Sequence, residues 1–235
     1  MFLTRFRINT ARLGSRRLLS SPQVLHAAVM ASFAAAPAHT GDDARVLWRV
    51  DHNTRTDVQL YLVSPTRPDL THLVEQAGWP TNETWTTYDY APFLGKLAAG
   101  DTWAFRLTAN PVHSVRTQDG QATTKRTAHR TPHHQAGWLL QRQEALGFRI
   151  VEKPVEPGSL PGGGEHELVV HGRRDQNFGK TEQATGRRNR VQLAAVTFDG
   201  RLQITDPDTL RTALTRGIGK GKAYGCGLLT LAPTR

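Results

Sequence analysis

The chain has 235 residues, 38% of them hydrophobic, which is enough for one large domain or two small ones with buried cores. Thirty Lys and Arg residues against twenty Asp and Glu give a formal net charge of +10, which indicates a polyanionic partner such as nucleic acid. A single cysteine, Cys226, excludes an intrachain disulfide, and no apolar run is long enough for a membrane-spanning helix. We therefore expect a cytoplasmic protein.

The positive charge is unevenly distributed along the chain. Residues 1–97 carry ten basic and eight acidic residues, whereas residues 98–235 carry twenty and twelve. We expect the second half to make most of the phosphate contacts.

The N-terminal stretch MFLTRFRIN alternates in side-chain character, with Phe2, Thr4, Phe6 and Ile8 on one side. This period of two predicts a strand. Residues 1–41 are also rich in Arg and Ser, as an organellar transit peptide would be, but strand periodicity argues against that alternative. The following segment, residues 10–20, is predicted to be a loop with three basic residues that are candidates for nucleic-acid binding: Arg12, Arg16 and Arg17.

Ser21 and Pro22 are predicted to start a helix that runs to about Ala35. At about 100° per residue, one face of this helix gathers the side chains expected to be buried: Leu25, Ala28, Val29, Ser32 and Phe33. Gln23, His26 and Met30 form a separate flank. The pattern leaves two interpretations of His26: an exposed helix residue, or a group that moves protons in RNA cleavage without a metal.

The rest of residues 1–97 completes a β-α-β-β-α-β order. Residues 45–52 and 57–64 are predicted to form a hairpin, residues 69–77 a short helix, and part of residues 84–93 a weaker strand. This order is that of a ferredoxin-like domain.

A second ferredoxin-like unit is predicted for residues 98–235, giving an α+β protein with two such domains in tandem. Its expected elements are a strand from Thr102 interrupted at Asn110-Pro111, a polar connection over 117–132, a helix over 133–146, a strand over 148–153 and a loop over 154–164. Two strands then flank a basic tip, Asp199-Gly200 is predicted as a two-residue turn, and Asp206 starts a final helix that ends at Gly217.

Basic residues gather in the predicted hairpin: Arg173, Arg174, Lys180, Arg187, Arg188 and Arg190. If about five or six of them neutralise phosphates, RNA binding should weaken by orders of magnitude between low and physiological salt. A solvated tip that only aids solubility is the alternative interpretation.

A glycine-rich loop precedes the last predicted strand and contains Gly217, Gly219, Gly221, Gly225 and Gly227. It contains neither a Walker motif nor GxGxxG. Its glycines allow close backbone approach to a partner, and its cations could meet phosphate: Arg216, Lys220 and Lys222. An ordinary turn between helix and strand is the alternative.

No metal site or cofactor is predicted. His129, His133, His134 and Cys226 offer suitable ligand atoms, but their spacing matches no common zinc module. No nucleophile elbow or paired-carboxylate pattern is present either.

Five segments together resemble the CasE family of CRISPR-associated endoribonucleases, which cut precursor CRISPR RNA within its repeats. They are MFLTRFRIN, LHAAVM, FRLTANPV, AGWLLQR and the C-terminal TFDGRLQITDPDTLRTALTRGIGKGKAYGCGLLTLAP. The resemblance implies two ferredoxin-like domains, binding of a repeat stem-loop and metal-independent cleavage on its 3′ side. Attack by the ribose 2′-hydroxyl would leave a 2′,3′-cyclic phosphate and a 5′-hydroxyl.

The same resemblance implies roles for particular residues. His26 falls on the family's catalytic histidine, as general base or general acid, and Gln23 stands where members often carry a tyrosine. The basic hairpin would grip the repeat stem, and the glycine-rich loop would lie near the RNA between the domains. The processed RNA would stay bound with the other subunits of the Cascade complex, and the protein would be a monomer outside it.

Two other functions remain open at this point. Gln23 favours a crRNA-binding subunit that has weak or no catalytic activity, because a glutamine side chain cannot act as an acid or base. A ferredoxin-like RNA-binding module unrelated to CRISPR is the third hypothesis, although no stretch matches the aromatic-rich RNP1 pattern of an RRM.

Overall fold

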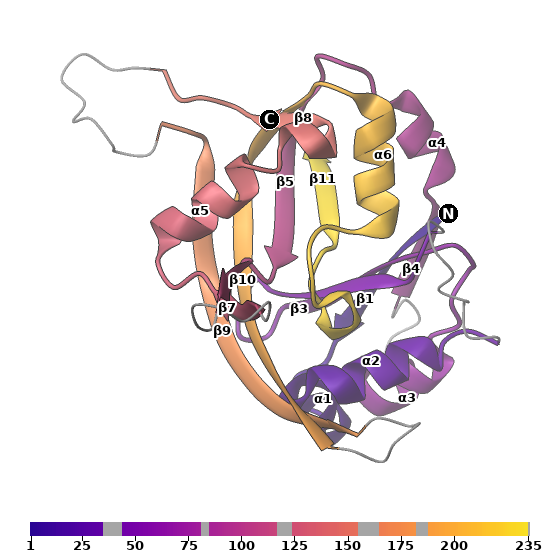
Figure 1. Ribbon diagram of the computed structural model, residues 1–235. Coiled ribbons are helices and arrows are strands. Elements are labelled where there is room, and N and C mark those ends of the chain that lie inside the picture. Colours follow the sequence, from indigo (N-terminus) through magenta and orange to yellow (C-terminus); the bar gives the residue numbers. More distant parts are fainter. Residues whose placement is uncertain (35–43, 81–84, 117–123, 155–164, 182–187, 235) are drawn as a thin grey trace. The chain divides into compact units, whose positions relative to one another are not determined.

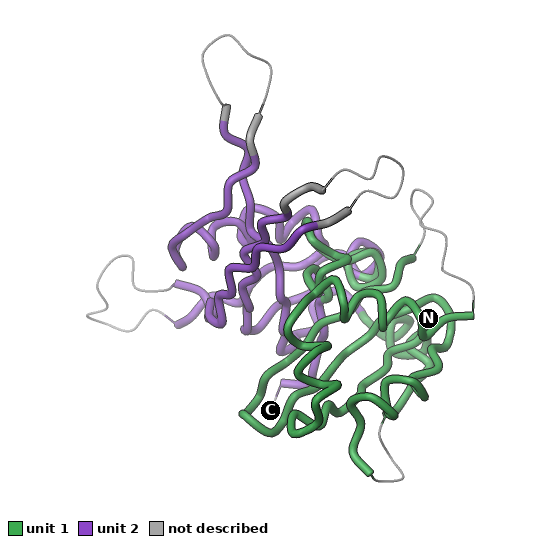
Figure 2. Tube along the Cα trace, turned by 90° about the horizontal axis from the view of Figure 1, so that it is seen from below, with its two compact units in different colours: residues 1–97, 211–228 green, residues 98–210, 229–235 purple. Residues whose placement is uncertain are grey.

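The computed structural model describes residues 1–34, 44–80, 85–116, 124–154, 165–181 and 188–234. These residues form two compact units, one of residues 1–97 with 211–228 and one of residues 98–210 with 229–235 (Figure 2). The expected domain limits, 1–97 and 98–235, differ from these units in the segment 211–228. That segment, which contains the glycine-rich loop, lies with the first unit.

The first unit contains a four-stranded antiparallel sheet in the order β2-β3-β1-β4 (Figure 1). Its strands are β1 (Phe2–Ile8), β2 (Leu47–His52), β3 (Val58–Ser64) and β4 (Trp85–Asp89). The predicted hairpin is confirmed, because β2 and β3 pair from Leu47↔Val63 to His52↔Val58. Within β1, burial alternates as its sequence predicts: Thr4, Phe6 and Ile8 are buried.

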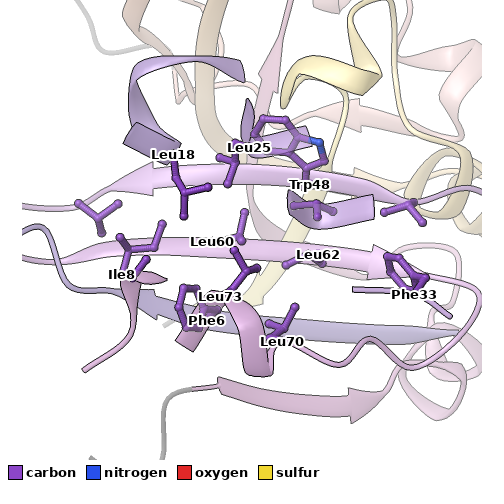
Figure 3. Packing of buried hydrophobic residues seen from close by; sticks show 14 residues of the cluster. Phe6, Ile8, Leu18, Leu25, Phe33, Trp48, Leu60, Leu62, Leu70 and Leu73 are labelled. Carbon is purple, nitrogen blue, oxygen red and sulfur yellow. The ribbon is translucent and has the colours of Figure 1, made fainter. Parts of the chain in front are cut away.

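Helices of the first unit contribute to a hydrophobic core on this sheet (Figure 3). They are α1 (Leu13–Ser20), α2 (Pro22–Met30) and α3 (Thr71–Ala77), and the unit also contains α4 (Ala91–Lys96) outside this cluster. Leu18 from α1, Leu25 from α2 and Leu73 from α3 join strand residues such as Phe6 and Leu60 in one cluster. Burial of these side chains fixes which side of α2 faces away from the core.

Helix α1 corrects the prediction of a loop over residues 10–20. Leu18 is 3% exposed, and the fully buried Ser15 donates a hydrogen bond from Oγ to the carbonyl of Asn9 at 2.5 Å. Arg16 and Arg17 lie exposed on the same helix. Few side chains of this helix are buried and many are polar, so its sequence shows only a weak helical periodicity of apolar residues.

Helix α2 confirms the predicted helix but ends earlier, at Met30 rather than near Ala35. Its predicted core face is confirmed: Leu25, Val29, Ser32 and Phe33 are buried and Ala28 is half-buried. Ser21 occupies the N-cap position, but its side chain makes no capping hydrogen bond, contrary to the sequence expectation. Helix α1 ends directly before Ser21, and Pro22 begins α2.

The second unit contains a sheet in the order β11-β5-β10-β8, with β9 paired to β10 (Figure 1). Its strands are β5 (Thr102–Ala109), β8 (Phe148–Ile150), β9 (Leu168–Thr181), β10 (Arg188–Ile204) and β11 (Leu229–Pro233). If β9 is left aside, the other four strands of this sheet can be numbered one to four along the chain. Read from β8 to β11, their order is then two-three-one-four, which is the order of the first sheet. Helices α5 (Pro132–Leu140) and α6 (Pro207–Arg216) supply the connections, so the predicted pair of ferredoxin-like folds is confirmed.

Two predicted elements of the second unit differ in extent. The connection expected over 117–132 contains a strand, β7 (Thr124–Ala128), which pairs with β6 (Val112–Arg116). The helix expected over 133–146 ends at Leu140 and is followed by a separate 3-10 turn, η1 (Glu144–Leu146). The TKRTA sequence of β7 is polar at nearly every position, so periodicity could not reveal it.

The predicted turn at Asp199-Gly200 is wrong, because both residues lie inside β10. The Asp199 carboxylate accepts hydrogen bonds at 2.7 Å from Nε and Nη2 of Arg106 on β5. Burial alone would raise the pKa of Asp199, but hydrogen bonds from Arg106 and His171 lower it below its usual value. A Cβ on Gly200 would lie 2.2 Å from the carbonyl oxygen of Glu167, so this glycine serves close strand approach rather than a turn.

Asp206 caps α6 as predicted. Its Oδ1 accepts the backbone N–H of Asp208 at 3.0 Å and that of Thr209 at 3.2 Å. The predicted apolar stripe is buried and consists of Leu210, Ala213 and Leu214. Within the ranges given above, no helix is long and apolar enough to cross a membrane.

Candidate active site

His26 lies on α2 outside its core face, as the helical geometry predicts, and is half-buried. Its Nδ1 accepts a hydrogen bond from the indole Nε1–H of Trp48 on β2, with 3.4 Å between the two nitrogen atoms. Trp48 is only 3% exposed and belongs to the core cluster of the first unit (Figure 3). The histidine is therefore attached to the sheet through a buried side chain that the sequence analysis did not single out.

The glycine-rich loop lies against the same tryptophan. A Cβ on Gly225 would lie 2.6 Å from Cζ3 of the Trp48 indole, and the φ of Gly225 is +77°. The 3-10 turn η2 (Lys222–Tyr224) packs against both α2 and β2. The loop, the tryptophan and the histidine thus form one cluster within the first unit, built from segments far apart in the sequence.

The loop backbone itself requires its glycines. Positive φ angles occur at all five of them: Gly217 (74°), Gly219 (76°), Gly221 (86°), Gly225 (77°) and Gly227 (93°). At Gly217 a Cβ would also meet Cδ2 of Leu47 at 2.7 Å. Loop geometry alone explains this composition, and phosphate contact by the loop stays a prediction.

Cationic side chains lie in the loop and next to it. Burial lowers the pKa of Lys222, and three neighbouring positive charges lower it further: Arg45, Lys220 and Arg216. Burial is the larger cause, and the smaller contribution of the like charges reflects positive side chains near Lys222. Their positive potential favours a phosphate group close to α2.

A buried ion pair anchors the end of the glycine-rich segment to β2. The guanidinium of Arg49, 2% exposed, donates from Nε to Oδ1 of Asp51 at 2.6 Å and from Nη2 to Oδ2 at 2.9 Å. Its Nη1 donates to the carbonyl of Leu228 at 3.0 Å. Arg49 therefore links the strand that carries Trp48 to the segment that contacts it.

The other predicted residues near the N-terminus have different surroundings. Arg12 donates from Nη1 to the carbonyls of Val74 and Gly78, each at 3.1 Å, and so satisfies the end of α3. Gln23 is exposed on α2, and Arg16 and Arg17 are exposed on α1. RNA contact by the three arginines and the place of Gln23 in the catalytic site stay predictions.

The basic hairpin is described only in part. Arg173 and Arg174 lie exposed on β9, where Arg173 donates to Oδ1 of Asp175 and to the carbonyl of Arg130. Lys180 on β9 and Arg188 and Arg190 on β10 belong to the paired part of these strands. Arg187 lies outside the described residues.

The residues considered for zinc do not form a common site. Cys226 is fully buried, and burial raises the pKa of its thiol to about 12, which opposes the thiolate that zinc requires. The histidine rings contact one another, with 4.5 Å between the centroids of His113 and His129 and 6.1 Å between those of His129 and His134. Among the described side chains, no group of three or more His, Cys, Asp or Glu could hold a metal ion.

The chain thus contains a pair of ferredoxin-like folds, and in the first unit a histidine lies in one cluster with a cationic, glycine-rich loop. A model of the family described as CRISPR associated protein matches residues 1–233, and the chain belongs to this family. The resemblance inferred from its five segments is thereby confirmed.

Two relatives and one solved structure show how far the similarity extends. The CRISPR-associated endoribonuclease Cse3 of Thermus thermophilus is 33% identical over 235 residues, covering 99% of this chain and 100% of that protein. The CRISPR system Cascade subunit CasE of Escherichia coli is 32% identical over 146 residues, 59% of this chain and 61% of that protein. A structure of Thermus thermophilus Cse3 bound to an RNA representing a pre-cleavage complex is 30% identical, with a TM-score of 0.70, covering 99% of this chain and 98% of that one.

Proposed function

We propose that this protein is an endoribonuclease that cleaves precursor CRISPR RNA within its repeats and then remains bound to the product as a subunit of Cascade. The observation that carries this proposal is His26, which is held by Trp48 beside the cationic loop in a chain similar over its full length to a CRISPR endoribonuclease. The similarity to a Cascade subunit supports retention of the product in that complex.

The proposed reaction is an internal transesterification. The 2′-oxygen forms a bond to the adjacent phosphorus, the bond between phosphorus and the 5′-oxygen breaks, and the products carry a 2′,3′-cyclic phosphate and a 5′-hydroxyl. One proton leaves the 2′-hydroxyl and one reaches the 5′-oxygen, so the covalent change is balanced. A histidine transfers such protons near neutral pH, and the cations of the loop would stabilise the charge that develops on the phosphoryl oxygens.

Gln23 limits the ways in which this site could work. Its amide can hydrogen-bond a phosphate oxygen or orient a ribose, but it cannot exchange a proton. A crRNA-binding subunit with weak or no activity is therefore the second candidate function. The family match excludes the third hypothesis, an RNA-binding module unrelated to CRISPR.

The deciding experiment incubates the purified protein with a labelled repeat hairpin in excess chelator. We expect one cut on the 3′ side of the stem, leaving a 2′,3′-cyclic phosphate and a 5′-hydroxyl. Tight binding without a cut would favour the second candidate function, and cleavage that requires added metal would contradict the mechanism.

Replacing Arg187, Arg188 and Arg190 together with Gln is expected to weaken hairpin binding and to reduce its salt dependence. If each arginine neutralises one phosphate, the slope of log K against log salt should fall by about two to three, because fewer counterions are released. Fluorescence titrations at several salt concentrations measure this slope.

A charge-matched control replaces three exposed arginines outside the hairpin with Gln: Arg55, Arg67 and Arg149. This variant has the same net charge and should keep a slope close to that of the wild type. Equal slopes in the two triple variants would show that the hairpin does not grip the phosphates.

A further inference from the structure

We propose that four histidines of the second unit form a binding site for phosphate groups of the RNA backbone, and that this site takes up protons when phosphate binds. These residues, the histidine cluster, are His113, His129, His133 and His134. A phosphate site here is a property of the chain itself, whereas its occupation by repeat RNA rests on the proposed function.

The rings of the histidine cluster lie next to one another, although they come from three separate segments. His113 on β6 and His129 directly after β7 have ring centroids 4.5 Å apart, with an angle of 34° between the ring planes. His134 on α5 is 6.1 Å from His129, and His133 meets His134 edge-on at 5.7 Å. His129 is half-buried and the other three are exposed, so an anion in solution can reach the rings.

Hydrogen bonds of the surrounding fold hold these segments in place. The backbone N–H of His129 donates to the carbonyl of Pro111 at 2.9 Å, and Nε2 of the buried Gln135 donates to the carbonyl of His129 at 2.9 Å. Thr131 caps α5 by accepting the N–H of His134, and its Oγ1 lies 2.7 Å from Nδ1 of the same histidine. The positions of the rings therefore depend on buried and capping groups rather than on surface side chains alone.

The elements that carry the cluster are cationic. The residues of β6, β7 and α5 include no Asp or Glu, and Arg126 and Arg130 are exposed. Burial lowers the pKa of His129, and three neighbouring groups lower it further when they are charged: His113, His134 and Arg142. The ring of His129 is therefore neutral near neutral pH, and it meets like charges when it is protonated.

Strand β9 packs against α5 and connects the cluster to the basic hairpin (Figure 1). Arg173 on this strand donates from Nη1 to the carbonyl of Arg130 at 2.8 Å. The one acidic residue of β9, Asp175, is paired with Arg173 at 3.0 Å, and His171 is paired with Asp199 of β10 at 3.0 Å. Both carboxylates are thus already paired, and an RNA stem held by the basic hairpin would run beside the cluster.

A phosphate group bound at the cluster would offset the repulsion among its protonated rings. Because a nearby opposite charge favours the charged form of a histidine, the pKa of His129 should rise when phosphate binds. The coupling is reciprocal, so phosphate must bind more tightly to the protonated cluster than to the neutral one. RNA affinity should therefore increase as the pH falls from the bound to the free pKa, and should level off on either side of that range.

The affinity for a repeat hairpin at two pH values tests this site. A 2′-deoxyribose at the scissile nucleotide prevents cleavage, and the salt concentration is held constant. A rise of about one unit in pKa on binding corresponds to about tenfold tighter binding, so the wild type should bind about tenfold more tightly at about pH 5.5 than at about pH 8. Fluorescence titration measures both affinities.

His113→Gln combined with His129→Gln should remove most of this pH dependence and leave the affinity at about pH 8 nearly unchanged, because neutral rings add no charge there. His52→Gln combined with His166→Gln is the matched control, since it also replaces one exposed and one half-buried histidine. Equal pH dependence in the two double variants would overturn the proposal. His113→Lys retains its charge at about pH 8 and should bind more tightly than wild type there, a gain that a damaged fold would not produce.

Histidine NMR separates the phosphate site from the proposed function. The His129→Gln variant identifies the His129 signals, and the pKa of this histidine is measured in sodium chloride and in inorganic triphosphate at equal ionic strength. We expect triphosphate to raise the pKa of His129 and to shift the signals of His52 much less. An unchanged pKa of His129 would contradict the site. If the hairpin binds at neither pH, the proposed function fails, while the triphosphate titration still decides the phosphate site.

Discussion

Replacing His26 with Ala is expected to reduce single-turnover cleavage of a repeat hairpin by about 10²–10⁴-fold, the usual contribution of one positioned acid or base. Binding of the hairpin should persist, because the substitution removes none of the cations around the glycine-rich loop. Rapid quench of labelled RNA gives the rate, and filter binding gives the affinity.

His52→Ala is the matched control for this variant. His52 is an exposed histidine at the end of β2 and should be replaced without loss of cleavage. Full cleavage by His26→Ala would remove the histidine from the mechanism. Loss of binding and cleavage together would instead indicate that the histidine helps to hold the RNA.

Asp51→Asn is expected to lower the free energy of unfolding by about 3–5 kcal/mol, because it leaves the Arg49 guanidinium buried without its counter-charge. The side chains of this pair are 2% and 7% exposed, so water cannot replace the lost carboxylate. Urea unfolding followed by tryptophan fluorescence measures the change.

Asp175→Asn provides a control of the same geometry. Arg173 and Asp175 form an ion pair with the same two-residue spacing on a strand, but their side chains are 34% and 61% exposed. Breaking this exposed pair should cost less than about 1 kcal/mol. Similar losses in both variants would show that burial of the Arg49–Asp51 pair does not determine its contribution.

Periodicity predicted the elements whose burial is strongly one-sided. In β1 alternate residues are buried, and in α2 the predicted stripe forms the core contact, so the position of His26 off that stripe followed from 100° steps alone. The start of α6 was also predictable from Asp206, because N-capping depends only on a few neighbouring residues.

Elements stabilised by distant contacts could not be predicted in this way. Helix α1 buries few side chains, β7 depends on its pairing with β6, and Gly200 is required by the carbonyl of Glu167 rather than by a turn. In each case the local sequence is compatible with a loop or turn, and tertiary packing decides otherwise.

Only the part of the candidate site that lies on α2 could be predicted from the sequence. Gln23 and His26 were placed on one flank, but the partners of that flank come from β2 and from the glycine-rich segment. Trp48 and Arg49 resemble ordinary residues of a β-strand until the fold brings Gly225 and Leu228 against them. No spacing rule connects residues so far apart in the sequence.

Residues 211–228 pack with the first unit, although the chain forms most of the second unit before it reaches them. This order affects when the site can form during translation. His26 leaves the ribosome well before Gly225 and its neighbours, because most of the chain described here lies between them. A nascent chain would therefore carry the histidine without the loop that restrains Trp48. Cleavage should begin abruptly, once residues 211–228 have been made, so a product terminated before them would lack activity rather than retain a fraction of it.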